Sequence, residues 1–91
     1  MDKSIHTREY TVFLCLLRQV REDRGVTQNR LAELLEATQT FVSKCERGER
    51  RLDVVELRQW CIALGVELCD FTQQFNDLTR SREGAQGQDR S

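Results

Sequence analysis

The sequence predicts an all-α protein that forms one domain of five short helices. Three observations support this: 91 residues suffice for a single core, proline is absent, and apolar residues recur at helical rather than strand spacing. Glycine commonly follows the end of a helix, and three glycines lie between stretches of helical apolar spacing, at Gly25, Gly48 and Gly65.

The first helix is expected over residues 10–24, because its apolar residues repeat every three or four positions, as on one buried face. They are Tyr10, Phe13, Leu14, Leu17 and Val20. Thr27 is a suitable N-cap for a second helix over residues 28–35, since threonine oxygen accepts from backbone N–H groups. The inward residues of this second helix are Leu31, Ala32, Leu34 and Leu35.

Thr38 is the next N-cap candidate and predicts a third helix over residues 39–47. Asp53 and Glu56 have the spacing of a capping box, which opens a fourth helix with an inner stripe of Leu57, Trp60, Cys61 and Leu64. A fifth helix is expected over residues 68–78. The segment after it is polar, which predicts a disordered tail at 79–91. The domain is therefore expected at 10–78, preceded by an N-terminal arm at 1–9.

The second and third helices have the pattern of a helix-turn-helix, two short helices joined by a tight turn. With Gln28 as position 1, the motif requires apolar residues at 4, 8, 10, 15 and 18 and a small residue, here Ala32, at 5. The apolar residues present are Leu31, Leu35, Ala37, Val42 and Cys45. The usual turn glycine at position 9 is replaced by Glu36, so we expect a slightly altered or mildly strained turn.

The chain resembles the phage-repressor helix-turn-helix family (Cro/CI-type, or XRE) over residues 10–78. The matching stretches are VREDRGVTQNRLAELL (20–35), TQTFVSKCERGERRLDVVEL (38–57) and ALGVELCDF (63–71). This resemblance implies a lambda-repressor-like fold and a third helix that enters the DNA major groove. Glu36 and Cys45 differ from the family's usual glycine and larger apolar residue.

The resemblance also implies DNA contacts for particular residues. Base contacts are expected from Gln39, Thr40, Ser43 and Lys44, and the amide of Gln39 is suited to adenine N6 and N7. Phosphate contacts are expected from Thr27, Gln28, Arg47, Arg50 and Arg51, although loop arginines also pair with acids such as Glu49. Phe41 is expected to be partly buried, and Glu46 to pair with Arg18 or Arg21.

The net charge of −1 alone argues against a nucleic-acid partner, because domains that bind phosphate are usually basic. The acidity is concentrated in residues 52–79, which have Arg58 as their only basic side chain. Their acids are Asp53, Glu56, Glu67, Asp70 and Asp77. Residues 1–51 are slightly basic, and we expect the acidic block to point away from DNA.

The four cysteines, Cys15, Cys45, Cys61 and Cys69, include no C-x-x-C pair and lie in or beside apolar stretches, which favours small hydrophobic side chains over redox or metal roles. We expect no metal, no cofactor and no small-molecule ligand, and no pattern of an enzyme is found. The longest apolar run, residues 12–17, is too short to span a membrane, so a cytoplasmic protein is expected.

The function predicted is sequence-specific binding of double-stranded DNA by a transcriptional regulator, expected to be a repressor that occupies an operator. Because one small domain offers a small interface, we expect a homodimer on two half-sites, with Phe71, Phe75 and Leu78 of the fifth helix at its interface. The alternative is a protein-interaction module, such as an antitoxin or anti-regulator, which the near-neutral charge favours.

Overall fold

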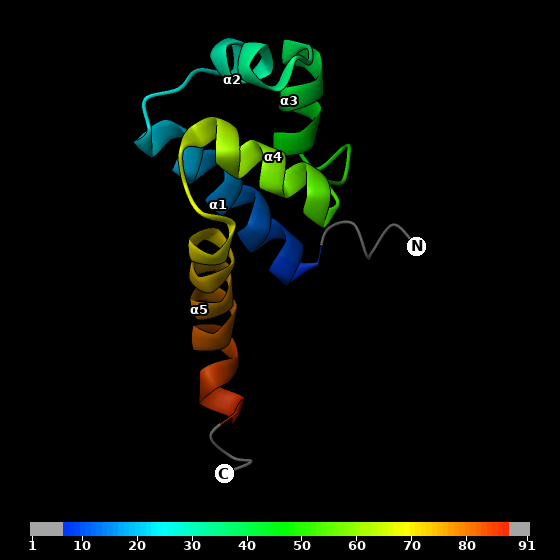
Figure 1. The fold of residues 1–91 in the computed structure, drawn as a ribbon. Coiled ribbons are helices and arrows are strands. Elements are labelled where there is room, and N and C mark those ends of the chain that lie inside the picture. The colour runs from blue at the N-terminus through cyan, green and yellow to red at the C-terminus, as the bar shows by residue number, and fades with distance from the viewer. Residues whose placement is uncertain (1–6, 88–91) are drawn as a thin grey trace.

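The computed structural model describes the chain from residue 7 to residue 87, and its side chains from residue 7 to residue 80. Within these residues the chain forms helices and no strand, which confirms the all-α prediction. The five helices are α1 (Arg8–Asp23), α2 (Gln28–Leu35), α3 (Gln39–Glu46), α4 (Val54–Leu64) and α5 (Leu68–Gly87). Figure 1 shows α2 and α3 together at one end of the molecule, while α5 extends away from the opposite end.

Side-chain caps begin four of the helices where the sequence has threonine or aspartate. Thr27 accepts from the Arg30 N–H at 3.0 Å, and Thr38 accepts from the Phe41 N–H at 3.0 Å. Asp53 and Glu56 form the complete capping box, each side chain accepting from the backbone N–H of the other. Thr7 caps α1 as a simple N-cap, with its side-chain oxygen accepting from the Tyr10 N–H at 3.1 Å. Local chemistry therefore determines where these helices begin.

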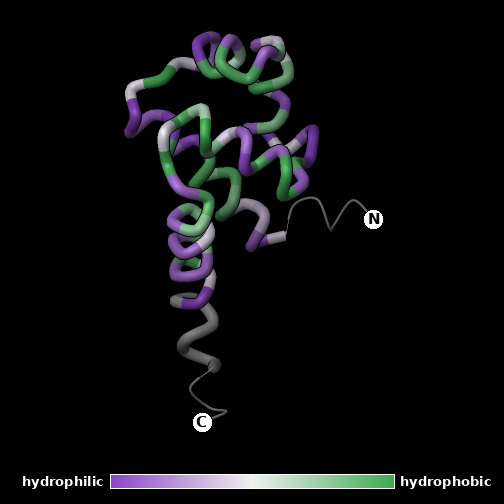
Figure 2. The backbone as a smooth tube through the Cα atoms, in the orientation of Figure 1, coloured by the Kyte–Doolittle hydropathy of each residue, from purple (hydrophilic) through white to green (hydrophobic). Residues whose placement is uncertain are grey.

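A single core lies between the helices and holds α3 in place. Leu17 and Leu31 are fully buried, as are Val42 and Cys45 on the inner side of α3 and Trp60 on α4. Figure 2 shows hydrophobic and hydrophilic residues interspersed along the coloured parts of the helices, as expected where each helix buries one face. The backbone also approaches α1 closely at Gly48, where a Cβ atom would lie 2.9 Å from Leu14 Cδ1. A larger residue there would require the Leu14 side chain to move, and the positive φ of 83° at this position favours glycine.

Two helices extend beyond their predicted limits. α1 begins at Arg8, so residues 8 and 9 of the predicted arm are helical, while residues 1–6 lie outside the described part of the chain. α5 continues to Gly87, whereas the polar sequence predicts a disordered tail from residue 79. No glycine or proline interrupts residues 66–83, and Thr79 is buried with its hydroxyl donating to the Phe75 carbonyl at 2.9 Å. Residues 88–91 lie outside the described residues.

Candidate nucleic-acid interface

The turn between α2 and α3 has the left-handed conformation that a glycine would normally provide. Glu36 adopts φ 58° and ψ 43°, and it is the only non-glycine residue with positive φ among the described residues. The turn is closed by the Ala37 N–H, which donates to the Ala32 carbonyl at 2.9 Å. The prediction of a mildly strained turn is therefore confirmed, and the glutamate keeps α2 and α3 in helix-turn-helix geometry at some cost in backbone energy.

The α3 helix has two chemically different faces. Val42 and Cys45 are buried against the core, whereas Gln39, Thr40 and Lys44 are exposed. Ser43 is half-buried, and so is Phe41, as the sequence predicts. Three of the four side chains expected to contact bases thus lie on the outer side of α3, away from the residues that anchor it, while Ser43 is only partly exposed.

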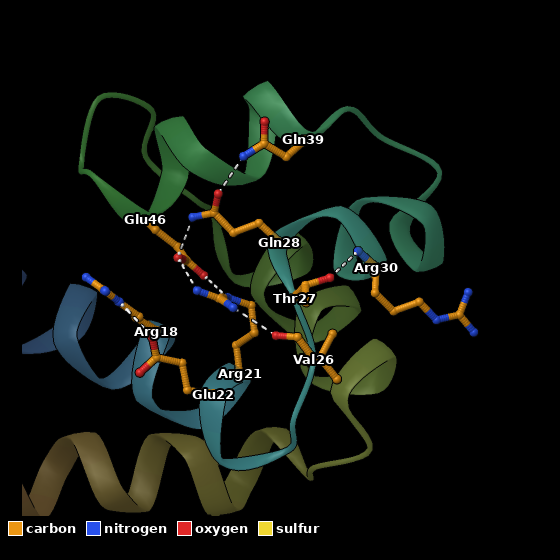
Figure 3. Close-up of polar contacts among 9 residues, drawn as sticks. All are labelled: Arg18, Arg21, Glu22, Val26, Thr27, Gln28, Arg30, Gln39 and Glu46. Atoms are coloured by element: carbon orange, nitrogen blue, oxygen red, sulfur yellow. Dashed lines mark hydrogen bonds and ion pairs between the residues drawn. The ribbon is translucent and has the colours of Figure 1, made fainter.

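The first of these side chains, Gln39, is held by a chain of hydrogen bonds that reaches the core (Figure 3). Gln39 Nε2 donates to Gln28 Oε1 at 2.6 Å, and Gln28 Nε2 donates to Glu46 Oε1 at 2.9 Å. Glu46 can only accept, so it orients the Gln28 amide with its nitrogen inward and its oxygen toward Gln39. This leaves the oxygen and the second N–H of Gln39 for a further partner.

The inner end of this chain is a buried ion pair between α1 and α3. Arg21 donates to both oxygens of Glu46, at 2.6 Å from Nε and 3.0 Å from Nη2, and its Nη1 donates to the Val26 carbonyl at 2.8 Å. The two side chains are 9% and 4% exposed. Hydrogen bonding to Glu46 raises the pKa of Arg21 above its usual value. Of the two partners expected for Glu46, the structure selects Arg21; Arg18 pairs with Glu22 instead.

The residues expected to contact phosphate differ in their surroundings. The Thr27 side-chain oxygen accepts from a backbone N–H as the cap of α2, and the residue is exposed. Arg47 donates to Glu49 at 2.9 Å and to the Ser43 hydroxyl, and both members of the Arg47–Glu49 pair are about half exposed. Glu49 therefore pairs with Arg47, and not with Arg50 or Arg51, the two loop arginines expected to pair with such an acid.

Arg50 and Arg51 each lie over an aromatic ring. The Arg50 guanidinium is 5.1 Å from the ring centroid of Phe41, and that of Arg51 is 4.2 Å from the ring centroid of Tyr10. Arg50 also forms an ion pair with Glu56 at 2.8 Å, so this acid of the 52–79 block faces the loop that follows α3. By contrast, Asp70 and Asp77 belong to α5, which extends away from α2 and α3 (Figure 1).

The surface expected to form a dimer is smaller than the sequence predicts. Phe71 is only 2% exposed, and its ring meets that of Phe13 on α1 edge to face at 5.9 Å. The prediction that Phe71 is available to a second subunit is therefore wrong, because the helical stripe that contains it faces α1. Phe75 is half-buried beside the same Phe13 ring, and Leu78 is 47% exposed.

The hydrogen bonds from Gln39 to Gln28 and from Gln28 to Glu46 are not among the sequence predictions. Gln28 and Gln39 are there assigned to DNA separately. The available signal was the helix-turn-helix spacing itself, which brings the N-termini of α2 and α3 together. The contact of Arg50 with Phe41 had no such signal, because loop geometry is not encoded in periodicity.

Comparisons with known proteins agree with this geometry. A family model described as a helix-turn-helix domain matches residues 13–71. The structure resembles an XRE-family-like protein from Pseudomonas syringae pv. tomato str. DC3000, with 38% identity, a TM-score of 0.76, and coverage of 86% of this chain and 95% of that one. It also resembles the clp gene regulator ClgR from Corynebacterium glutamicum, with 25% identity, a TM-score of 0.72, and coverage of 92% and 89%. No curated protein sequence matches the chain.

Proposed function

The chain belongs to the XRE-type helix-turn-helix family of DNA-binding regulators, and on that premise we propose that it represses transcription by occupying an operator as a homodimer. In this proposal α3 lies in the major groove, where its exposed face contacts base edges. Its buried face packs against the core of the domain. The proposal places the protein in the cytoplasm, with the DNA.

The observation that carries the proposal is the fixed orientation of Gln39. One hydrogen of its Nε2 is engaged by Gln28, while Oε1 and the other hydrogen remain available. An acceptor beside a donor is complementary to adenine, which offers the N6 donor next to the N7 acceptor in the major groove. Guanine offers two acceptors at this edge, so we expect Gln39 to select adenine.

We propose that the base pairs next to this adenine are contacted by Thr40, Ser43 and Lys44. The phosphates of the DNA backbone are contacted by Thr27, Gln28, Arg47 and Arg51. Gln28 and Thr27 stand at the N-terminus of α2, where the helix dipole favours a phosphate. The Arg47–Glu49 pair is exposed, and such pairs contribute little to stability, so Arg47 can exchange Glu49 for a phosphate without loss of fold.

The proposed dimer uses the outer side of α5 without Phe71. Phe75 borders a hollow of about 350 Å³, and Leu78 is exposed one turn further along α5. The other apolar walls of the hollow are Tyr10, Phe13, Leu52, Val54 and Leu57. Sedimentation equilibrium with operator DNA is expected to show two chains per site, and Leu78→Asp is expected to reduce this to one. Asn76→Asp, at another exposed position of α5, is the control. One chain per site for the wild type contradicts the dimer, and one chain per site for both variants contradicts Leu78 as its contact.

The salt dependence of DNA affinity tests the function as a whole. Duplexes recovered from a randomised pool at low salt are titrated with the full chain between about 50 and 200 mM salt, and each phosphate contact contributes about −0.9 to the slope of log K against log salt. We expect several contacts and therefore a steep negative slope. The near-neutral charge favours the alternative of a protein-interaction module. If no duplex is enriched at low salt, that alternative replaces DNA binding.

A further inference from the structure

Arg50 lies in the loop of residues 47–53 between α3 and α4, and its guanidinium contacts both helices. Nη1 and Nη2 donate to the two oxygens of Glu56, at 2.9 and 2.8 Å, in a bidentate pair. Nη1 also donates to the Arg51 carbonyl at 2.6 Å. The same guanidinium lies over the ring of Phe41, the third residue of α3. Arg50 therefore connects the first turn of α3 to the first turn of α4.

The α4 end of this connection is rigid. Glu56 Oε1 accepts from the Asp53 N–H at 2.9 Å, and the Glu56 N–H donates to Asp53 Oδ1 at 2.8 Å. The hydrogen bonds from Arg50 and from the Asp53 backbone lower the pKa of Glu56, so the carboxylate stays charged around neutral pH. A guanidinium bound to Glu56 is thus held by a complete capping box rather than by a mobile side chain.

The α3 end is not fully held by packing. The Phe41 ring borders a hollow of about 230 Å³, lined otherwise by Leu35, Ala37, Leu52, Glu56, Gln59 and Trp60. Side chains in close-packed cores have little room to change rotamer, but a ring beside such a hollow can move into it. The Arg50 guanidinium covers this ring, and the attraction between a cation and an aromatic face opposes that movement.

The geometry points to Arg50 as a positioning residue for DNA reading, and not the phosphate anchor that its place beside the recognition helix suggests. Its charge is paired with Glu56, and three of its five N–H groups bind Glu56 and the Arg51 carbonyl, so a phosphate would have to compete with that carboxylate for the guanidinium. While Arg50 is bound to Glu56, its guanidinium keeps the Phe41 ring in position. Phe41 immediately follows Gln39 and Thr40 at the N-terminal end of α3, where bases are read. This inference rests on the proposed DNA-binding function.

The test measures DNA affinity of the full chain against salt for wild type, Arg50→Gln, Arg50→Lys and Glu56→Gln. Arg50→Gln is expected to weaken binding by about fivefold at every salt concentration with an unchanged slope. Arg50→Lys is expected not to restore affinity, because lysine cannot make the bidentate pair. Glu56→Gln is expected to weaken binding as well, although it removes a negative charge, and glutamine keeps the capping box.

Matched variants in the same loop separate positioning from charge. Glu49→Gln removes an exposed acid and is expected to leave affinity unchanged or tighter, and Arg47→Gln to reduce the slope by about 0.9. Thermal denaturation first establishes that each variant is folded at the assay temperature. If Arg50→Gln reduces the slope by about 0.9, Arg50→Lys restores binding and Glu56→Gln tightens it, Arg50 is a phosphate anchor and only this inference fails. If wild type binds no duplex, the proposed function fails with it.

Discussion

Gln39 on α3 donates its side-chain amide hydrogen to Gln28 on α2, with 2.6 Å between Gln39 Nε2 and Gln28 Oε1. Because Glu46 binds the other end of the Gln28 amide, the direction of this bond is set from inside the protein (Figure 3). The side chain expected to read a base is therefore oriented before DNA arrives, which lowers the conformational entropy lost on binding.

Replacing Gln28 is expected to weaken base discrimination at the position that Gln39 reads. Gln28→Ala removes the acceptor for Gln39 Nε2, and the loss of one orienting hydrogen bond corresponds to about fivefold less preference for adenine there. Competition binding with duplexes that differ at this base pair measures the effect, and Asn29→Ala, one residue along α2, is the control. Strict additivity of Gln28→Ala and Gln39→Ala would show that the two residues act independently.

Breaking the Arg21–Glu46 pair is expected to destabilise the domain strongly. Arg21→Met leaves a buried carboxylate without its cation, a change that costs about 3–5 kcal/mol of unfolding free energy, as measured by urea denaturation. Arg18→Met removes the arginine of an exposed pair, whose side chains are 64% and 48% exposed, and is expected to cost less than about 1 kcal/mol. The double variant Arg21→Met with Glu46→Leu should be more stable than Arg21→Met alone. If the double variant is the less stable, desolvation is not the main cost.

Glycine in place of Glu36 is expected to stabilise the protein. The left-handed backbone at Glu36, with φ 58°, costs a residue with a Cβ atom about 1 kcal/mol relative to glycine. For a domain of this size that difference raises Tm by about 4–8 °C in calorimetry. Glu36→Ala keeps the Cβ atom and serves as control, with little change in Tm. An equal rise for alanine would mean that the carboxylate, and not the backbone, is the source of the strain.

The four thiols are expected to react in two groups. Cys15 and Cys69 are exposed, whereas Cys45 and Cys61 are buried, and burial raises the pKa of each buried thiol to about 11. At pH 8 an aromatic disulfide reagent should therefore label Cys15 and Cys69 rapidly and the other two only in denaturant, because the thiolate is the reactive form. The variant with serine at both exposed positions should stay unlabelled while folded. Fast modification of its Cys45 would instead indicate a redox-responsive recognition helix.

The sequence predicts the helices well because their signals are local. Thr27, Thr38 and the Asp53–Glu56 box lie where the caps form, and α2 has its predicted limits. The position of Phe71 was not predictable from the same signals. A helical stripe shows that one face is apolar, but whether α1 or a second subunit covers it depends on tertiary packing.

The features of the candidate site also fall into those that the sequence predicts and those that depend on tertiary packing. The exposed positions of Gln39, Thr40 and Lys44 follow from the period of α3, and the pairing of Glu46 with α1 was among the predicted interactions. The connection of Arg50 to Glu56 and Phe41 depends on a loop conformation that residue spacing does not determine. Sequence therefore identified which residues face outward, and the structure shows which of them already have partners.

The most direct test is the comparison of DNA motifs selected from a randomised duplex pool by wild type and by Gln39→Ala. We predict that wild type enriches a two-fold symmetric motif with a fixed adenine in each half-site, and that Gln39→Ala loses the preference at that position alone. A bidentate amide–adenine pair contributes about 1–3 kcal/mol of discrimination, so the difference in base frequency should be large. An unchanged motif for Gln39→Ala, or no motif for wild type, would contradict the account.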